Sequence, residues 1–151
     1  MMSTHIRPPS AADKERWEQL WRGYLQFYEA ERSDRQFAST WDRILKPDGE
    51  IRCLLATGAE GGAVGLAHFL YHASAWSDEP VCYLQDLFVA PDHRSGGIGG
   101  KLIDAVAGAS RERGASKLYW LTQVSNRSAR LLYDKVGRNT GFIRYEIPLV
   151  P

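Results

Sequence analysis

Four glycines lie in the stretch APDHRSGGIGGKLIDA, residues 90–105, directly before an apolar pattern typical of a helix. Each glycine weakens a helix by about 1 kcal/mol relative to alanine, so their position at a helix start needs a reason. Glycine lets the backbone come close to a ligand and expose its N–H groups. A helix N-terminus offers free donors and the positive end of the helix dipole, which suit a phosphate. The stretch therefore indicates a phosphate-binding loop.

Three phosphate-binding patterns can be tested on these letters. The P-loop pattern requires Gly at Ser95 and Ser or Thr at Leu102, and the dinucleotide fingerprint requires Gly at Leu102, so both fail. The third pattern is Arg or Gln, two residues, Gly, one residue, then Gly or Ala. Arg94, Gly97 and Gly99 meet it.

Polar residues also interrupt a long β-rich run, 81–89, where Gln85 and Asp86 stand side by side. Polar groups in the middle of a strand need partners or a wet cleft. Asp86 can accept a proton, whereas a glutamine cannot act as a base. His68 and His72 share a face of an earlier strand by parity, but no third ligand is evident, so no metal site is expected.

Hydrophobic spacing predicts helices and strands along the chain. The predicted strands are 6–8, 51–57, 63–71, 81–89, 117–122 and 141–149, and the predicted helices are one behind Ser10, one over 37–45, one beginning near Ile98 and one over 125–137. Ser10 and Asp13 resemble a capping box. An aromatic stripe from Trp17 to Tyr28 falls on one helical face and either packs in the core or lines a pocket. The order predicts one α/β domain whose mixed sheet has helices on both faces.

Composition narrows the class of protein. The chain has 151 residues, 44% of them apolar and 25% charged, which fits one globular domain. The net charge of +1 gives no global field for nucleic acid, and no apolar run is long enough to span a membrane. We expect a cytoplasmic protein. Cys53 and Cys82 lie far apart in apolar stretches, so we expect two buried thiols and neither a disulfide nor a zinc site.

Charge is less even in the C-terminal part. Residues 111–145 carry eight Lys or Arg against Glu112 and Asp134. A solvated basic face and a docking site for a polyanion explain this equally well.

Two blocks resemble a known family. The strand LQDLFV, the glycine stretch and the following helix resemble motif A of the GNAT superfamily, the acetyl-coenzyme A-dependent N-acetyltransferases. NRSARLLYDKVG is similar to the helix that follows in that family, with Asn126 at its start and Tyr133 seven residues later. The segment IRPPSAADKERWEQLW looks like the family's first strand and helix, so the resemblance covers essentially the whole chain.

The resemblance implies an architecture and a branch. We expect a single GNAT domain over 1–151, with a mixed, mostly antiparallel sheet of six to seven strands. VGLAHFLYHASAW, QDLFV and LLYDKVG are similar to the diamine acetyltransferases and to fungal enzymes described as histone and D-amino acid acetyltransferases.

The resemblance also implies how acetyl-CoA, the expected cosubstrate, is held without a metal. In the family the pyrophosphate lies on backbone N–H groups of the glycine loop, and the strand before the loop splays from its neighbour to admit the pantetheine arm. An N–H near Val89 would face the thioester oxygen. Carried over by position, the coenzyme-binding residues are Leu87, Phe88, Val89, Arg94, Ser95, Gly96, Gly97, Ile98, Gly99, Gly100, Lys101 and Asn126.

Catalytic roles carry over in the same way. Tyr133 would be the general acid that protonates the leaving thiolate, because a phenol with a pKa of about 10 matches an alkyl thiol. The general base stays open, with Asp86, His68, His72 and Glu29 as candidates. Tyr28 and Glu29 match a Tyr-Glu pair near the acceptor site. The diamine branch has an acidic residue where Gln85 stands, which argues against a diamine acceptor. The expected substrate contacts are Tyr28, Glu29, Gln85, Asp86 and His68.

Three functions follow as hypotheses. The first is acetyl transfer in a ternary complex to a primary amine of a small molecule, such as an amino acid or a polyamine-like compound. The second has a lysine or N-terminus of a protein as the acceptor. The third is a coenzyme A-binding sensor without turnover. We also expect a homodimer through the C-terminal strand, because an open sheet edge there invites pairing.

Overall fold

The computed structural model describes residues 4–151, which form two compact units, one ending at Leu121 and the other running from Thr122 to Pro151. The first unit contains a five-stranded sheet in the order β1-β2-β3-β4-β5. Its strands are β1 (His5–Arg7), β2 (Arg52–Thr57), β3 (Ala63–Ser74), β4 (Ser77–Val89) and β5 (Leu118–Tyr119). Neighbouring strands are antiparallel except β4 and β5, which are parallel, so the predicted mixed sheet is confirmed.

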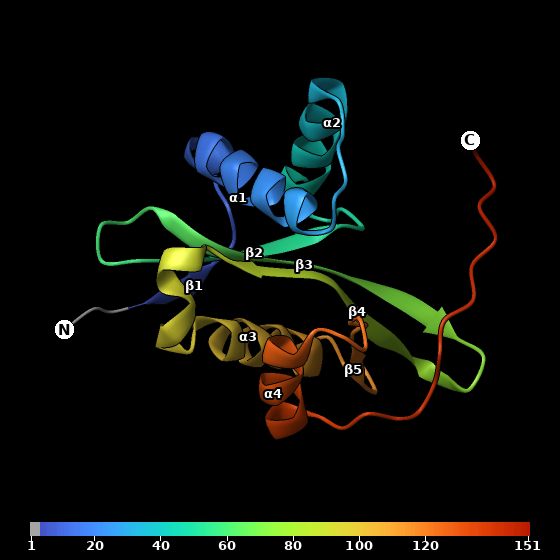
Figure 1. Ribbon diagram of the computed structural model, residues 1–151. Helices are drawn as coiled ribbons and strands as arrows, with labels where there is room; N and C mark the ends of the chain where they lie inside the picture. Colours follow the sequence, from blue (N-terminus) through green and yellow to red (C-terminus); the bar gives the residue numbers. More distant parts are fainter. Residues whose placement is uncertain (1–3) are drawn as a thin grey trace. The chain divides into compact units, whose positions relative to one another are not determined.

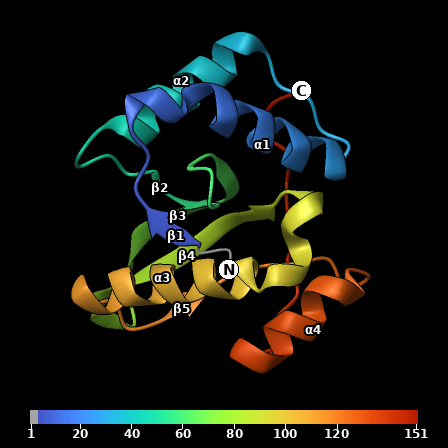
Figure 2. The same cartoon turned by 90° about the vertical axis from the view of Figure 1, so that its left-hand side faces the viewer.

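Helices cover both faces of this sheet, as predicted. Figures 1 and 2 show α1 (Lys14–Phe27) and α2 (Asp34–Leu45) on one face and α3 (Ile98–Glu112) on the other. Two short 3-10 segments, η1 (Ala11–Asp13) and η2 (Pro91–Gly96), precede α1 and α3.

The aromatic stripe of α1 lies in the core between α1, α2 and the sheet. Trp17 is fully buried and packs on Trp41 of α2 with ring centroids 5.0 Å apart. Leu55 and Leu66, paired across β2 and β3, complete this core. On the opposite face α3 buries Ile98, Leu102, Ile103 and Val106, as its spacing predicts. Gly114 ends α3 with a left-handed φ of 80°, and Ala115 N–H donates to Ser110 O, which is a Schellman cap.

The predicted six to seven strands are wrong: the residues that the structure describes form five. The segment 141–149 alternates as a strand does, yet it carries no strand pairing, and Phe142, Tyr145 and Leu149 are all more than 85% exposed. A strand needs a neighbour for its backbone groups, and Pro148 cannot donate. Two other boundaries also differ. The predicted loop 72–80 is the tip of the β3–β4 hairpin, and the predicted strand 117–122 shortens to β5.

The second unit contains α4 (Arg127–Val136), which matches the predicted helix. Asn126 is its N-cap, because Asn126 Oδ1 accepts from Ala129 N–H at 3.4 Å. Gly137 follows the helix in an extended conformation.

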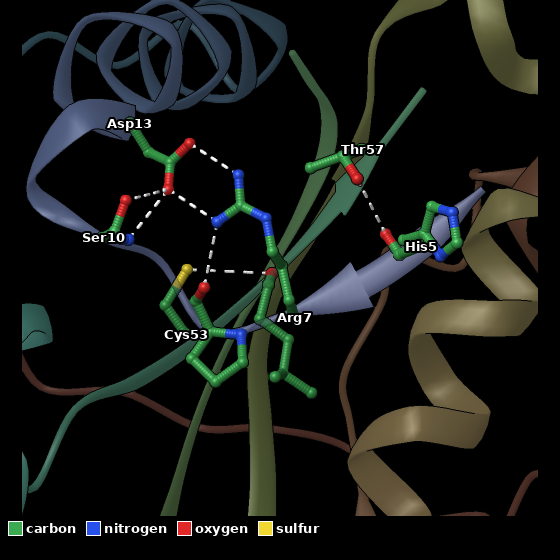
Figure 3. Close-up of polar contacts among 8 residues, drawn as sticks. His5, Arg7, Ser10, Asp13, Cys53 and Thr57 are labelled. Atoms are coloured by element: carbon green, nitrogen blue, oxygen red, sulfur yellow. Dashed lines mark hydrogen bonds and ion pairs between the residues drawn. The ribbon is translucent and has the colours of Figure 1, made fainter. Parts of the chain in front are cut away.

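The entry into α1 is held by an ion pair (Figure 3). Asp13 Oδ2 accepts from Ser10 N–H at 2.8 Å, which completes the acidic half of the predicted capping box. Arg7 donates to both carboxylate oxygens, at 2.7 and 2.8 Å. The Arg7 hydrogen bonds are the largest cause that lowers the pKa of Asp13 to about 2.

This ion pair predicts a loss of stability in acid. Asp13 is a carboxyl whose pKa is lower in the folded state than its ordinary 3.8, so its contribution is present above pH 3.8 and is lost as the pH falls towards 2. Arg7 is partly exposed, so we expect about 1 kcal/mol from the pair. In Arg7→Met the acid-induced decrease should be smaller by this amount. Urea unfolding at pH 6 and pH 2.5 measures it, and identical decreases in both proteins would contradict the assignment.

Candidate active site

A β-bulge separates the neighbouring residues Gln85 and Asp86. On β3, His68 pairs with Asp86 and the next residue, Phe69, pairs with Leu84, so Gln85 is the extra residue of β4. Side chains alternate along a strand, and the bulge shifts that alternation. Gln85 is exposed, whereas Asp86 is buried on the face that carries α1. The bulge therefore places a carboxylate inside the protein.

The buried carboxylate of Asp86 is the end of a hydrogen-bonded chain. Trp17 Nε1 donates to His68 Nε2 at 3.0 Å, and His68 Nδ1 lies 3.0 Å from Asp86 Oδ2. The three residues come from α1, β3 and β4. Trp17 is 0%, His68 2% and Asp86 9% exposed, so these three hydrogen-bonded side chains are shielded from water except at the carboxylate.

Two tyrosines, one in α1 and one at its C-terminal end, lie near the same carboxylate. Burial raises the pKa of Tyr24 far above its usual range, and the charge of Asp86 and a hydrogen bond to Asp86 raise it further. Burial, followed by the charge of Asp86, also raises the pKa of Tyr28, which is 37% exposed. Both phenols therefore stay protonated beside the carboxylate.

Aromatic rings form the wall beside these hydroxyls. Trp21 stacks on Tyr24 with centroids 4.9 Å apart, and its edge lies against His68 at 4.7 Å. Tyr24 also contacts Tyr28 at 5.0 Å and Phe88 at 6.2 Å. We call these residues, Trp21, Tyr24, Tyr28 and Phe88, the aromatic wall. It offers ring faces and hydroxyls next to one carboxylate, which is a suitable environment for a cation.

The predicted acceptor residues are only partly brought together. Asp86 and His68 are in direct contact, and Tyr28 lies within reach of the charge of Asp86. Gln85 is exposed on the bulge. Glu29 follows α1 with a φ of 55°, the one positive φ among the described non-glycine residues, and it is also exposed. His72 is exposed and its Nε2 lies 3.0 Å from the Tyr119 hydroxyl.

The glycine loop has the backbone that phosphate binding requires. Gly97 stands between η2 and α3 with a left-handed φ of 73°, and a Cβ placed on it would meet open space. Lys101 N–H makes the first helical bond, to Gly97 O at 3.1 Å. The N–H groups just before Lys101 belong to the first turn, which has no intrahelical acceptors. These open donors and the exposed Lys101 side chain fit a diphosphate.

Arg94 ties this loop to the end of β4. Its Nε donates to Val89 O at 2.9 Å, and its guanidinium lies 5.3 Å from the centre of the Phe88 ring. Phe88 in turn packs against α1, where a Cβ on Gly23 would lie 3.2 Å from the ring. A groove of ≈ 560 Å³ runs beside these residues, lined by Gly23, Phe27, Phe88 and Arg94 among others.

Strand β4, which precedes the glycine loop, extends further than its neighbour β5. β5 pairs with β4 only at Cys82–Leu118 and Tyr83–Tyr119, while β4 continues to Val89. The predicted slot residues 87–89 therefore lie beyond the end of β5. Their other edge is paired with β3, where a Cβ on Gly65 would be 3.1 Å from Phe88 O. Gly65 thus allows the close strand packing that supports the slot.

Two predicted residues belong to the second unit. Asn126 caps α4, and its Nδ2 donates to Thr122 Oγ1 at 3.4 Å. Tyr133 is half-buried on α4 and its carbonyl accepts from Gly137 N–H at 2.9 Å.

The sequence did not single out the roles of three α1 residues. Trp17 donates a hydrogen bond from the core, and Trp21 and Tyr24 contact His68 and Asp86. The aromatic stripe was the available signal, since it left both a core and a pocket open. The structure shows that the stripe has both roles: Trp17 lies in the core, whereas Trp21 and Tyr24 lie beside His68 and Asp86.

Other chemistry is limited within the described part of the chain. Cys53 and Cys82 are both buried, and burial raises the pKa of each thiol, as expected for inert cysteines. Residues 4–151 contain no cluster of His, Cys, Asp and Glu side chains arranged to hold a metal ion. None of the helices described there combines the length and apolar character that a bilayer crossing requires.

Comparison with known proteins agrees with this geometry. The sequence profile of the Acetyltransferase (GNAT) family matches residues 17–137. The chain is 36% identical over 135 residues to the D-amino-acid N-acetyltransferase HPA3 of Saccharomyces cerevisiae, covering 89% of this chain and 84% of that protein. It is 32% identical over 143 residues to the uncharacterized N-acetyltransferase YhfO of Bacillus subtilis, covering 93% and 95%.

A solved structure shows the same fold. The aminoglycoside N-acetyltransferase AAC(6')-Iy, solved in complex with CoA, superposes with a TM-score of 0.84 at 20% identity, covering 99% of this chain and 97% of that one. The family match, the two relatives and the glycine loop lead to one conclusion: the chain belongs to the GNAT family and is an N-acetyltransferase that uses acetyl-CoA.

Proposed function

We propose that this enzyme transfers the acetyl group of acetyl-CoA to the primary amine of a small molecule, an amino acid or a polyamine-like compound. The observation that carries the proposal is a single carboxylate, Asp86, beside the aromatic wall. A primary amine arrives as a cation, which a carboxylate and ring faces attract. The name of the yeast relative, a D-amino-acid N-acetyltransferase, supports an acceptor of this size.

Donor binding is assigned to the loop and the strand end. Backbone N–H groups of residues 95–100 bind the pyrophosphate, with Arg94 and Lys101 on either side. The pantetheine arm lies along Leu87, Phe88 and Val89, and the Val89 N–H faces the thioester oxygen. Support comes from the left-handed Gly97 and from the end of the β5 pairing before this stretch.

The chemistry is a direct transfer in a ternary complex. Asp86 takes one proton from the ammonium, directly or through a water, and the free amine nitrogen attacks the thioester carbon. The C–N bond forms and the C–S bond breaks, and the nitrogen, which is cationic after the attack, loses its second proton to water. The acetyl group thus ends as a neutral amide, and the net reaction releases one proton to solvent. Tyr133 gives its phenolic proton to the departing thiolate. Stabilising the developing oxyanion by a backbone donor and aligning the reactants supply the remaining rate enhancement.

Further contacts are assigned around the acceptor. Tyr28 of the aromatic wall and Glu29, the next residue, contact the acceptor, and the exposed Gln85 offers an amide next to Asp86. Asn126 contacts the pantetheine from the start of α4. A second acidic residue is lacking at the position of Gln85, so the acceptor carries one amine near the site rather than two.

Thiol release with acetyl-CoA tests the proposal. Initial rates should be measured with amino acids of both configurations, with polyamines, and with lysine-containing peptides and peptides with a free N-terminus. We expect turnover with amino acids or polyamine-like amines and little with peptides. Faster turnover with peptides would point to a protein acceptor. Saturable coenzyme binding without turnover on any amine would point to a sensor.

Gly97→Val should weaken acetyl-CoA binding. A β-branched residue in the left-handed region costs about 2 kcal/mol, so the free loop relaxes to another conformation that turns its N–H groups away, and binding must restore the strained one. We expect Kd to rise about 30-fold. Isothermal titration calorimetry measures it, with Gly108→Ala as the control, because a Cβ on Gly108 also meets nothing within 4 Å. An unchanged Kd in Gly97→Val would remove the loop from the coenzyme site.

The C-terminal segment supports a homodimer. Residues 142–150 carry large apolar side chains that are more than 70% exposed: Phe142, Ile143, Tyr145, Ile147, Leu149 and Val150. An alternating segment of this kind pairs with the free strand edge of a second copy. Light scattering should give about twice the chain mass of 17.0 kDa, and truncation after Asn139 should give the monomer. A full-length monomer would contradict the dimer.

A further inference from the structure

We propose that Trp17 and His68 are positioning residues that hold Asp86 as a proton acceptor facing the amine. This inference rests on the role proposed for Asp86 above. Trp17 and His68 lie on the core side of Asp86, so the proposed role is to support the carboxylate and not to contact the acceptor. The carrying observation is the unbroken chain from the Trp17 indole through the His68 ring to the Asp86 carboxylate.

The direction of this chain follows from its first member. An indole N–H can donate but cannot accept. His68 Nε2 lies 3.0 Å from that N–H and must therefore offer its lone pair. In the neutral ring the hydrogen then sits on Nδ1, which lies 3.0 Å from Asp86 Oδ2 and donates to it. A second proton, on Nε2, would point at the indole hydrogen.

As a consequence, Asp86 and His68 have different roles: Asp86 accepts the proton and His68 supports it. His68 has no lone pair left for an amine, because Nε2 is occupied by Trp17. On its protein side, one carboxylate oxygen of Asp86 accepts the Nδ1–H of His68. Its remaining lone pairs are available on the slightly exposed side. The arrangement identifies Asp86, and not His68, as the group that accepts the proton.

The chain also fixes where the carboxylate points. Trp17 is immobilised by its fully buried ring, which packs on Trp41 at 5.0 Å and on Phe37 at 6.4 Å. The bulge at Gln85 sets the backbone of Asp86, and His68 holds one carboxylate oxygen. Rigid placement of a reacting group lowers the barrier to reaction, and its loss is expected in kcat.

A spectroscopic measurement tests the tautomer without any turnover. In the full-length protein, ¹⁵N-edited NMR of the His68 ring distinguishes a proton on Nδ1 from one on Nε2, and the His68→Gln spectrum assigns the signals. We expect the proton on Nδ1 in the wild type. In Trp17→Phe the Asp86 carboxylate still keeps the proton on Nδ1, but the Nε2 lone pair loses its hydrogen bond, so we expect the ¹⁵N signal of Nε2 to shift. A wild-type proton on Nε2, or an unchanged Nε2 signal in Trp17→Phe, overturns the proposal.

Kinetics tests the consequence. Trp17→Phe should lower kcat about tenfold, the loss expected when one hydrogen bond to a supporting group is removed, with KM for acetyl-CoA unchanged. Trp41→Phe is the matched control, because it removes equal volume from the same cluster while leaving the Trp17 donor to His68 Nε2 in place, and it should keep kcat within about twofold. Equal losses in the two variants would reduce Trp17 to a packing role and overturn the proposal.

Two substitutions of His68 separate positioning from packing. The amide nitrogen of Asn can replace Nδ1 as a donor to Asp86, whereas that of Gln lies nearer the place of Nε2. His68→Asn should therefore retain clearly more kcat than His68→Gln. Equal loss in both contradicts the proposal. If no amine is turned over by the wild type, the proposed function fails, while the NMR result still decides the tautomer.

Discussion

Asp86→Asn should lower acetyl transfer by at least about 10²-fold, the usual contribution of a general base. An amide oxygen can still accept from His68 Nδ1, which lies 3.0 Å from Asp86 Oδ2, so the local structure should persist. What is lost is a group that takes up a proton, and with it the charge that attracts the ammonium. The measurement is thiol release at saturating acetyl-CoA, together with the coenzyme Kd, which should stay within about twofold of the wild type.

Asp104→Asn provides the control for this substitution. Asp104 is exposed on α3, on the sheet face opposite α1, so its neutralisation should leave kcat unchanged. A second test uses an acceptor amine of low basicity, which is already neutral at the assay pH and needs no proton removed before it attacks. Its rate should fall less in Asp86→Asn than the rate of a basic amine. Equal rates for wild type and Asp86→Asn on a basic amine would assign the proton to bulk water.

Local signals in the sequence predicted much of the fold correctly. Ser10 and Asp13 indicated a helix start, because capping depends on residues within a few positions of each other. The glycine loop before α3 was predicted for the same reason. Gly97 takes the left-handed conformation in this loop, and the residue type alone is enough to indicate that conformation.

The partner of Asp86 could not be predicted in this way. The sequence shows two adjacent polar residues in a strand, and either can face the core. A bulge decides between Gln85 and Asp86, because a shift of one residue moves side chains to the other face. His68 becomes the partner only through this register. Trp17 was correctly expected on the buried stripe of α1, but its donor role depends on a strand 51 residues away.

The C-terminal segment illustrates the opposite failure. The strand predicted over 141–149 rests on alternation alone, yet a strand exists only with a neighbour. The described chain provides no paired neighbour for it, so the sheet has five strands rather than six to seven. A local pattern therefore indicates which secondary structure a segment can adopt, and a strand forms only when a neighbouring strand is present to pair with it.

Tyr133→Phe should lower kcat about 10²-fold and leave acetyl-CoA binding within about twofold, because only the hydroxyl that protonates the leaving thiolate is removed. The ring remains, so packing of α4 should be kept. A coenzyme analogue whose thiol is more acidic needs less protonation, and its rate should fall less in this variant. Tyr145→Phe is the matched control, since Tyr145 is 88% exposed in the same unit. Equal rates of Tyr133→Phe and wild type would show that water protonates the thiolate, because no other change in the variant could compensate for a missing acid.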